Sequence, residues 1–185
     1  MSTEDKLKNV SHTFGNTVLP AVVGSQTKYR TIVADPPWKY GKWAAPTNRK
    51  MQEYDMPYET MSVEAIKALN VADLADENCE LYLWTTQKYL PDAFEVLKAW
   101  GFKYCQTLTW CKTPRGKGQG GVYCPTNEFL ILGRKGKMPK VERVDTTWFH
   151  TKRADIPSVR KDEFRQLILK IKPAQTVGYL FINYV

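Results

Sequence analysis

Apolar residues along this chain recur with two spacings, one typical of strands and one typical of helices. Tyr29 to Ala34 is a short β-branched and apolar run that stops at Asp35-Pro36-Pro37, which predicts a strand ended by prolines. Similar runs predict further strands at residues 80–85, 104–111, 129–132 and 176–185. Between these runs, apolar residues recur at i, i+3 and i+4 within residues 63–69, 93–100 and 164–171, which indicates amphipathic helices. The alternation predicts an α/β fold with a mostly parallel sheet flanked by helices.

The ends of these helices carry their own signals. Ser62 is suited to cap the first helix, and Gly101 to stop the second. Ser158 precedes the third, with Asp162 and Glu163 near its start, where acidic side chains favour the helix dipole. Residues 1–28 have weak periodicity and are expected to form an N-terminal arm, so residues 29–185 are expected to be a single domain. Residues 39–58 and 112–127 are expected to be long loops.

The charge of the chain favours a polyanionic partner. The net charge is +8, and from Lys103 to Lys140 there are eight basic residues and one acidic residue, Glu128. Two basic loops follow predicted strands, and we expect both to flank the edge of the sheet where Tyr29 to Ala34 ends and to contact phosphates, although solvated loops are the alternative. The residues concerned are Lys112, Arg115, Lys117, Arg134, Lys135 and Lys137, together with Asn127 and Glu128, for which a polar turn before a strand is an equal alternative.

Other classes of protein are not favoured. The four cysteines form no Cys-x-x-Cys pair and the chain has two histidines, so we expect no metal site and reduced thiols. No apolar run approaches the roughly 20 residues of a membrane helix, and Met1 to Val10 lacks an apolar signal core, so a cytoplasmic protein is expected.

Asp35-Pro36-Pro37-Trp38 is the most informative stretch of the sequence. A residue before proline is held extended, and the prolines fix two φ angles and remove two N–H donors. The result is a stiff loop that presents a carboxylate, backbone carbonyls and an indole. The exocyclic amine of a base is a poor nucleophile, because its lone pair is delocalised into the ring. Accepting its hydrogens at a carboxylate and a carbonyl would return electron density to nitrogen, while the indole stacks the base.

This motif resembles that of the amino methyltransferases that act on nucleic acids, and the Trp form resembles the MT-A70 family of adenine 6-amino methyltransferases. Other stretches follow in the family's order. They are Pro57-Tyr58-Glu59-Thr60-Met61-Ser62, Leu81-Tyr82-Leu83-Trp84, Trp110-Cys111-Lys112-Thr113, and Gly120 to Gly133 with Asn127 and Glu128 inside it. The ordered set spans about residues 29–181 and is far more specific than the four-residue motif alone.

The resemblance implies an S-adenosylmethionine cofactor and a Rossmann-like sheet whose order is permuted, with the catalytic motif before the cofactor-binding half. It implies that Ile32 and Asp35 contact the cofactor, and that Arg160, in the turn that begins at Ser158, stands where the family has a lysine. Cofactor contacts are also implied for Leu180, Phe181 and Asn183. The last strand, Tyr179 to Asn183, lacks the acid and the arginine of the family pattern.

We therefore expect an S-adenosylmethionine-dependent adenine methyltransferase of bacterial or phage type, with DNA favoured over RNA and the target base taken out of the stack. Asp35 and the Pro36 carbonyl are expected to hold the amine and Trp38 to stack the base, with packing of Trp38 on the core as the alternative. The altered last strand favours an alternative, a silent nucleic-acid-binding partner of an active subunit. Methylation of the cytosine amine is a weaker alternative. A second copy of the chain or a different subunit is the expected protein partner.

Overall fold

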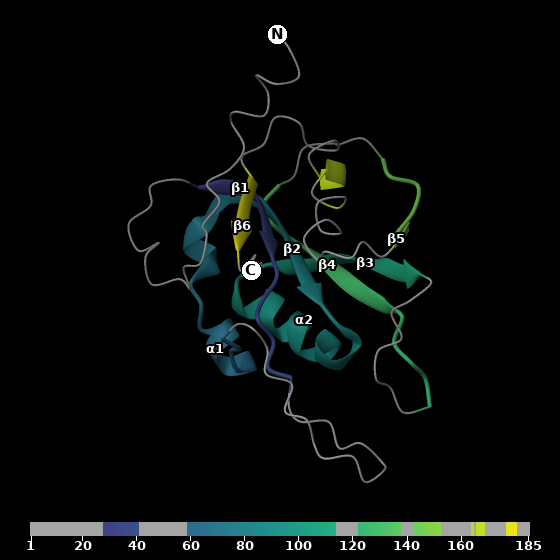
Figure 1. Ribbon diagram of the computed structural model, residues 1–185. Helices are drawn as coiled ribbons and strands as arrows, with labels where there is room; N and C mark the ends of the chain where they lie inside the picture. The colour runs from purple at the N-terminus through teal and green to yellow at the C-terminus, as the bar shows by residue number, and fades with distance from the viewer. Residues whose placement is uncertain are drawn as a thin grey trace.

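A mixed β-sheet forms the centre of the fold in the computed structural model (Figure 1). The structure describes residues 28–40, 59–113, 122–137, 143–152, 164, 166–168 and 177–180. Within them the sheet has six strands in the order β5-β3-β4-β2-β1-β6. The strands are β1 (Tyr29–Ala34), β2 (Ala75–Thr85), β3 (Lys103–Thr113), β4 (Asn127–Lys135), β5 (Trp148–Lys152) and β6 (Val177–Leu180).

Strand direction decides which residues share an edge of this sheet. β1 pairs in parallel with β2 and β6, and β3 pairs in parallel with β5. β4 is antiparallel to both of its neighbours, β2 and β3. All described strands except β4 therefore run in one direction, and their carboxyl ends meet the start of β4 at a single edge. The predicted α/β class with a mostly parallel sheet is confirmed.

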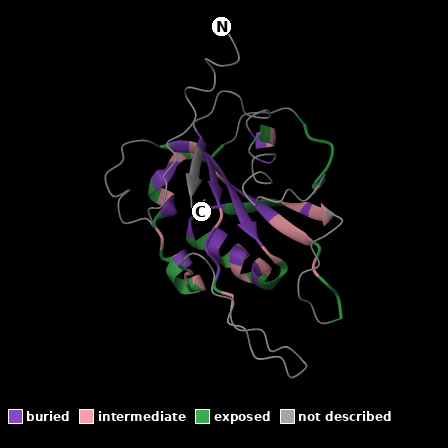
Figure 2. Cartoon of the chain, viewed as in Figure 1, coloured by how far each residue is buried: buried purple, intermediate pink, exposed green. Residues whose placement is uncertain are grey.

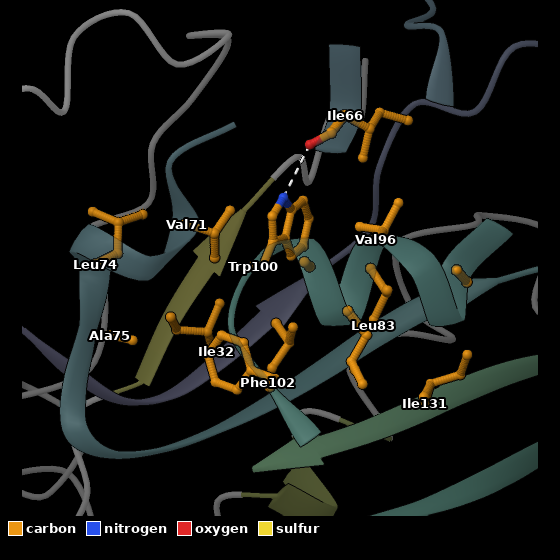
Figure 3. Close-up of a cluster of buried hydrophobic side chains, with 14 of the residues drawn as sticks. Ile32, Ile66, Val71, Leu74, Ala75, Leu83, Val96, Trp100, Phe102 and Ile131 are labelled. Carbon is orange, nitrogen blue, oxygen red and sulfur yellow. Dashed lines mark hydrogen bonds between the residues drawn. The ribbon is translucent and has the colours of Figure 1, made fainter. Parts of the chain in front are cut away.

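One face of the sheet is covered by α1 (Val63–Lys67) and α2 (Leu90–Ala99). Side chains from alternate positions of β1 and β2, such as Ile32 and Leu83, pack against these helices. Trp100, which follows α2, is almost fully buried and donates its indole N–H to the carbonyl of Ile66 at 3.0 Å, so the helices are tied to each other (Figure 3). The apolar stripe of the second predicted helix thus forms the core.

The opposite face has its own apolar cluster. It contains Tyr82, Trp84 and Leu130 from the sheet and Phe164 and Ile168 from the helical residues 164 and 166–168. Both faces of the central strands are therefore buried (Figure 2), which explains why their sequences are apolar without strict alternation. None of the helices in the described residues is long and apolar enough to span a membrane.

The predicted helix boundaries at Ser62 and Gly101 are confirmed. The Ser62 hydroxyl accepts from the backbone N–H of Ala65 at 3.1 Å and caps α1. Gly101 has a φ of 81°, and the N–H of Phe102 donates to the carbonyl of Leu97 at 3.1 Å. This is the bonding pattern of an α-helix that ends with a glycine in the left-handed conformation. The chain can then turn back into β3.

The main error in the predicted elements is β5, which the sequence analysis missed. β2 begins at Ala75 rather than at residue 80, and β4 begins at Asn127 rather than at residue 129. The last predicted strand is described only as Val177–Leu180. Apart from Lys28, the predicted N-terminal arm lies outside the described residues, as does most of the long loop at residues 39–58.

Candidate active site at the carboxyl edge of the sheet

Strand register brings the candidate residues of the sequence analysis to one edge. Asp35 directly follows β1, whose last residue, Ala34, pairs with Leu83 of β2 and Leu180 of β6. On the other side of β2, the start of β4 pairs with the end of β3, where Asn127 lies opposite Cys111. Neighbouring strands are about 4.8 Å apart, so β1 and β4, with β2 between them, are about 10 Å apart across the sheet, and Asn127 lies four residues beyond the level of Ala34.

The Asp35 loop is held by its own backbone. The N–H of Trp38 donates to the Pro36 carbonyl at 2.8 Å, and the N–H of Met61 donates to the Pro37 carbonyl at 2.8 Å. Trp38 and Met61 also form an isolated parallel bridge. The two proline carbonyls therefore already accept hydrogen bonds, whereas the sequence analysis expected the loop to present them free. The Pro36 oxygen keeps a second lone pair, because a carbonyl can accept two hydrogen bonds.

Trp38 is a core residue in this structure and not an open stacking surface. Its side chain is 3% exposed and belongs to the cluster on the α1 and α2 face. Its indole N–H donates to the carbonyl of Trp84 at 3.2 Å, and its ring stacks on Tyr89 with centroids 5.0 Å apart and planes 17° apart. The expectation that Trp38 stacks the target base is therefore wrong in this conformation. Its indole instead fixes the loop that carries Asp35.

The turn between β2 and α2 completes this support. The Tyr89 hydroxyl donates to the backbone carbonyl of Lys39, and the Tyr89 ring meets the Tyr40 ring edge-to-face at 5.3 Å. The hydroxyls of Tyr40 and Thr86 are 2.9 Å apart and hydrogen-bonded. Residues about 50 positions apart in the sequence thus hold one another at the edge. The sequence analysis missed Tyr89, because only its contacts show its role.

The residues expected to contact a cofactor fall into three groups. Asp35 is half-buried at the edge, and the backbone of Leu180 lies beside Ala34, so both are placed where a ligand of this edge would bind. Ile32 is fully buried in the core, so it offers a cofactor no surface, and the expectation of a contact is wrong for this residue. Ser158, Arg160, Phe181 and Asn183 lie outside the described residues.

Lys112 and Glu128 form an ion pair with each other at the same edge. Both side chains are largely buried, with 19% and 24% exposed, and the Lys112 ammonium also lies 5.2 Å from the centroid of the Trp110 ring. The pair and the neighbouring Asn127 join the ends of β3 and β4. Part of the Lys112 charge is therefore balanced within the protein. Arg115 and Lys117 lie outside the described residues.

The second basic loop lies at the opposite edge, contrary to the sequence analysis. Because β4 is antiparallel, its last residues pair with the first residues of β2 and β3, and Lys135 lies opposite Cys79. Arg134, Lys135 and Lys137 therefore do not flank Asp35. A role for them in nucleic-acid binding stays a prediction, without support from the edge geometry.

Arg134 instead compensates a buried acid. Its Nε donates to Oε1 of Glu80 at 2.9 Å, and the Tyr82 hydroxyl donates to the other oxygen at 3.3 Å. The Glu80 side chain is 1% exposed. Burial raises the pKa of Tyr82 to about 12, although the Arg134 cation acts in the other direction. The sequence analysis assigned Arg134 to phosphate binding because its basic loop follows a predicted strand.

Two exposed apolar residues near this carboxyl edge were also missed. Val122 is 91% exposed and Tyr123 is 88% exposed, and they shortly precede β4. An exposed aromatic ring beside polar strand ends is suited to stacking an unpaired base. A tyrosine within a Gly- and Lys-rich loop was the available sequence signal.

The arrangement is suited to transfer chemistry on an amine. The ends of β1 and β6 lie side by side at this edge, together with the half-buried Asp35 and the Pro36 carbonyl. The described part of the edge also carries two exposed lysines, Lys39 and Lys88. A carboxylate and a carbonyl close together can accept both hydrogens of an amino group.

Comparison with known proteins agrees with this geometry. The MT-A70 family model matches residues 29–181. The chain is 27% identical over 126 residues to the type II methyltransferase M.MunI of a Mycoplasma species, covering 60% of this chain and 53% of that protein. It is 27% identical over 160 residues to a putative N(6)-adenosine-methyltransferase MT-A70-like protein of Medicago truncatula, covering 83% and 24%.

A third relative has a different description. The chain is 29% identical over 118 residues to the N6-adenosine-methyltransferase non-catalytic subunit MTB of Arabidopsis thaliana, covering 60% of this chain and 14% of that protein. In all three matches the aligned part spans about half of the relative or less.

Proposed function

This chain belongs to the MT-A70 family, and on that premise we propose that it methylates the 6-amino group of adenine in a nucleic acid. The observation that carries the proposal is the Asp35 loop, whose carboxylate lies at the carboxyl edge of β1 while Trp38, Met61 and Tyr89 fix the backbone around it. A fixed acceptor pair at that edge is what an unreactive amine requires.

The reaction rests on two acceptors of this chain. Asp35 accepts one amino hydrogen, and the second lone pair of the Pro36 carbonyl accepts the other. Electron density on the nitrogen rises, and the lone pair is oriented towards the ends of β1 and β6. After transfer, Asp35 is placed to stabilise the positively charged amine until its proton is lost.

The residues at this edge fit S-adenosylmethionine as the methyl donor. A sulfonium cation is stabilised beside a carboxylate, which Asp35 provides, and strands β1 and β6 end side by side there. Asp35 and Leu180 are the described residues that would hold it. When bound, S-adenosylmethionine supplies a methyl group already activated for transfer.

We propose DNA as the preferred polymer. The net charge of +8 suits any nucleic acid, and M.MunI is described as a type II methyltransferase, whereas the plant relative is described as an adenosine methyltransferase. In a duplex the target amine is inaccessible within the stack, so the base must be extruded or the strand unpaired.

The test is mass-spectrometric detection of 6-methyladenine after incubation with S-adenosylmethionine and, separately, duplex DNA, single-stranded DNA or RNA. Asp35→Asn should lower the rate at least about 100-fold, because the variant keeps the shape but loses the charged acceptor. Asp76→Asn is the matched control, since Asp76 is also half-buried but lies at the start of β2, on the opposite edge. It should keep the wild-type rate.

Equal product from wild type and Asp35→Asn would refute the catalytic role of Asp35. Absence of product on every polymer would refute the enzyme proposal. If the protein then still bound nucleic acid, the alternative of a silent binding partner would replace it, which the match to the non-catalytic subunit MTB favours.

A further inference from the structure

Two exposed lysines lie beside the catalytic loop and belong to none of the basic segments described above. Lys39 directly follows Trp38, and Lys88 belongs to the turn between β2 and α2. The bond from the Tyr89 hydroxyl to the Lys39 carbonyl joins these two segments. The two lysines therefore lie on neighbouring parts of the same edge, although they are far apart in the sequence.

The ammonium group of Lys88 is held by aromatic rings. Its Nζ lies 4.9 Å from the centroid of the Tyr89 ring and 5.5 Å from that of the Tyr40 ring. Such contacts contribute modestly at exposed sites, but they restrict where the ammonium lies. The same rings support the catalytic loop, since Tyr89 stacks on Trp38. The position of the Lys88 charge is thus coupled to the position of the loop.

The distance from Lys39 to Asp35 suits a phosphate next to the target nucleotide. Lys39 is four residues from Asp35, so their Cα atoms are at most about 14 Å apart even in a fully extended chain. Phosphates along one strand are spaced by about 3.4 Å of helix rise, so this distance spans only a few nucleotides. A nucleic acid whose adenine amine meets Asp35 therefore has backbone phosphates within a few nucleotides of Lys39, and the bond between Tyr89 and Lys39 puts Lys88 on the neighbouring segment.

We propose that Lys39 and Lys88 form a phosphate-binding site that holds the strand next to the target adenine. The proposal rests on the proposed function for the identity of the polymer. Contacts to phosphate position a strand without reading its sequence, so the site contributes affinity and not base preference. Tyr40 and Tyr89 position the Lys88 ammonium, and they connect strand binding to the loop that carries Asp35.

The experiment measures binding of a fluorescent single-stranded oligonucleotide containing adenine at several salt concentrations. Lys39→Gln combined with Lys88→Gln should weaken binding about tenfold, and should lower the slope of log Kd against log salt by about 1.4, since each phosphate contact on a single strand contributes about 0.7. Lys39→Arg with Lys88→Arg should keep both values, because the charges remain.

The matched control is Lys98→Gln combined with Lys103→Gln, which removes the same charge from exposed lysines. Lys98 is in the last turn of α2 and Lys103 begins β3, so both lie away from the catalytic edge. This control should change Kd less than about twofold, because charges beyond roughly 8 Å are largely screened at physiological salt. Unchanged thermal unfolding of all the variants would show that the fold is intact.

If the double Gln variant had the Kd and salt slope of the control, the phosphate site would be refuted while the methyltransferase proposal stood. If it weakened binding as expected but the wild type methylated no polymer, the site would stand and the proposed function would fall. A wild type that bound no nucleic acid would overturn the site.

Discussion

Replacement of Trp38 tests whether this residue supports the Asp35 loop or stacks the target base. The indole is 3% exposed, donates to the Trp84 carbonyl and stacks on Tyr89. Removal of a buried tryptophan by Trp38→Ala should cost about 3–5 kcal/mol of unfolding free energy. Trp38→Phe keeps a ring but loses the donor to Trp84, so it should cost about 1–2 kcal/mol. In a chain of this size, 1 kcal/mol corresponds to about 2–4 °C in Tm.

The assay is thermal unfolding of the free protein, followed by circular dichroism. Trp38→Ala should lower Tm by about 6–20 °C and Trp38→Phe by about 2–8 °C. Trp148→Ala is the matched control, because Trp148 is 60% exposed on the edge strand β5. It should change stability by less than about 1 kcal/mol.

Kinetics of the Phe variant give a second and independent reading. If Trp38 fixes the loop, Trp38→Phe should lower kcat through misplacement of Asp35 and leave KM for nucleic acid nearly unchanged. A base-stacking residue would behave in the opposite way, with unchanged Tm of the free protein and a raised KM. That second pattern would refute the assignment of Trp38 to the core.

The remaining predictions concern the buried cluster on the opposite face. The pKa of Tyr82 is raised from 10.0 to about 12, so the neutral phenol stabilises the fold fully below pH 10, and this stability should be lost between pH 10 and 12, by up to about 3 kcal/mol. Chemical denaturation across this range should show the loss in the wild type and not in Tyr82→Phe, and equal pH profiles would contradict the prediction. Arg134→Met should cost about 2–4 kcal/mol by urea denaturation, because it removes the Arg134 cation from the buried Glu80 carboxylate. Glu80→Met combined with Arg134→Met should recover most of that loss. Lys135→Met, a control on the same strand, should have little effect on stability. An Arg134→Met variant as stable as that control would show that the ion pair is not needed.

The sequence could predict those elements whose own residues show why they form, through an apolar pattern or a capping side chain. Tyr29–Ala34 is apolar because both of its faces are buried, and Ser62 caps α1 through its own side chain. β5 has no such pattern. Trp148 and His150 are exposed, and the strand is fixed by its backbone pairing with β3. An edge strand with exposed side chains leaves no apolar periodicity to detect.

The candidate site could be predicted where it depends on the order of residues along the chain. The prediction failed where the site depends on strand direction or on contacts between distant residues. Asp35 at the end of a strand follows from the prolines. The misplaced group, Arg134 and its neighbours, followed from the assumption that every strand ends at the same edge, and the antiparallel β4 breaks that assumption. Likewise, the identity of Trp38 does not reveal that Tyr89, about 50 residues later, covers its ring.

The ordered motifs that identified the family form a frame around Asp35. Trp38 bonds the carbonyl of Trp84, and the ring of Trp84 meets that of Trp110 edge-to-face at 6.0 Å, so Trp84 connects three motifs from separate parts of the chain. The Met61 motif is tied to the Pro37 carbonyl. Most of the recognisable sequence therefore serves stability and loop geometry. The residues proposed to contact substrate, Asp35 together with the exposed lysines of the edge, lie outside the apolar clusters. Their replacement should leave the fold intact while turnover or nucleic-acid binding is weakened, whereas replacement of the aromatic frame should reduce stability and function together.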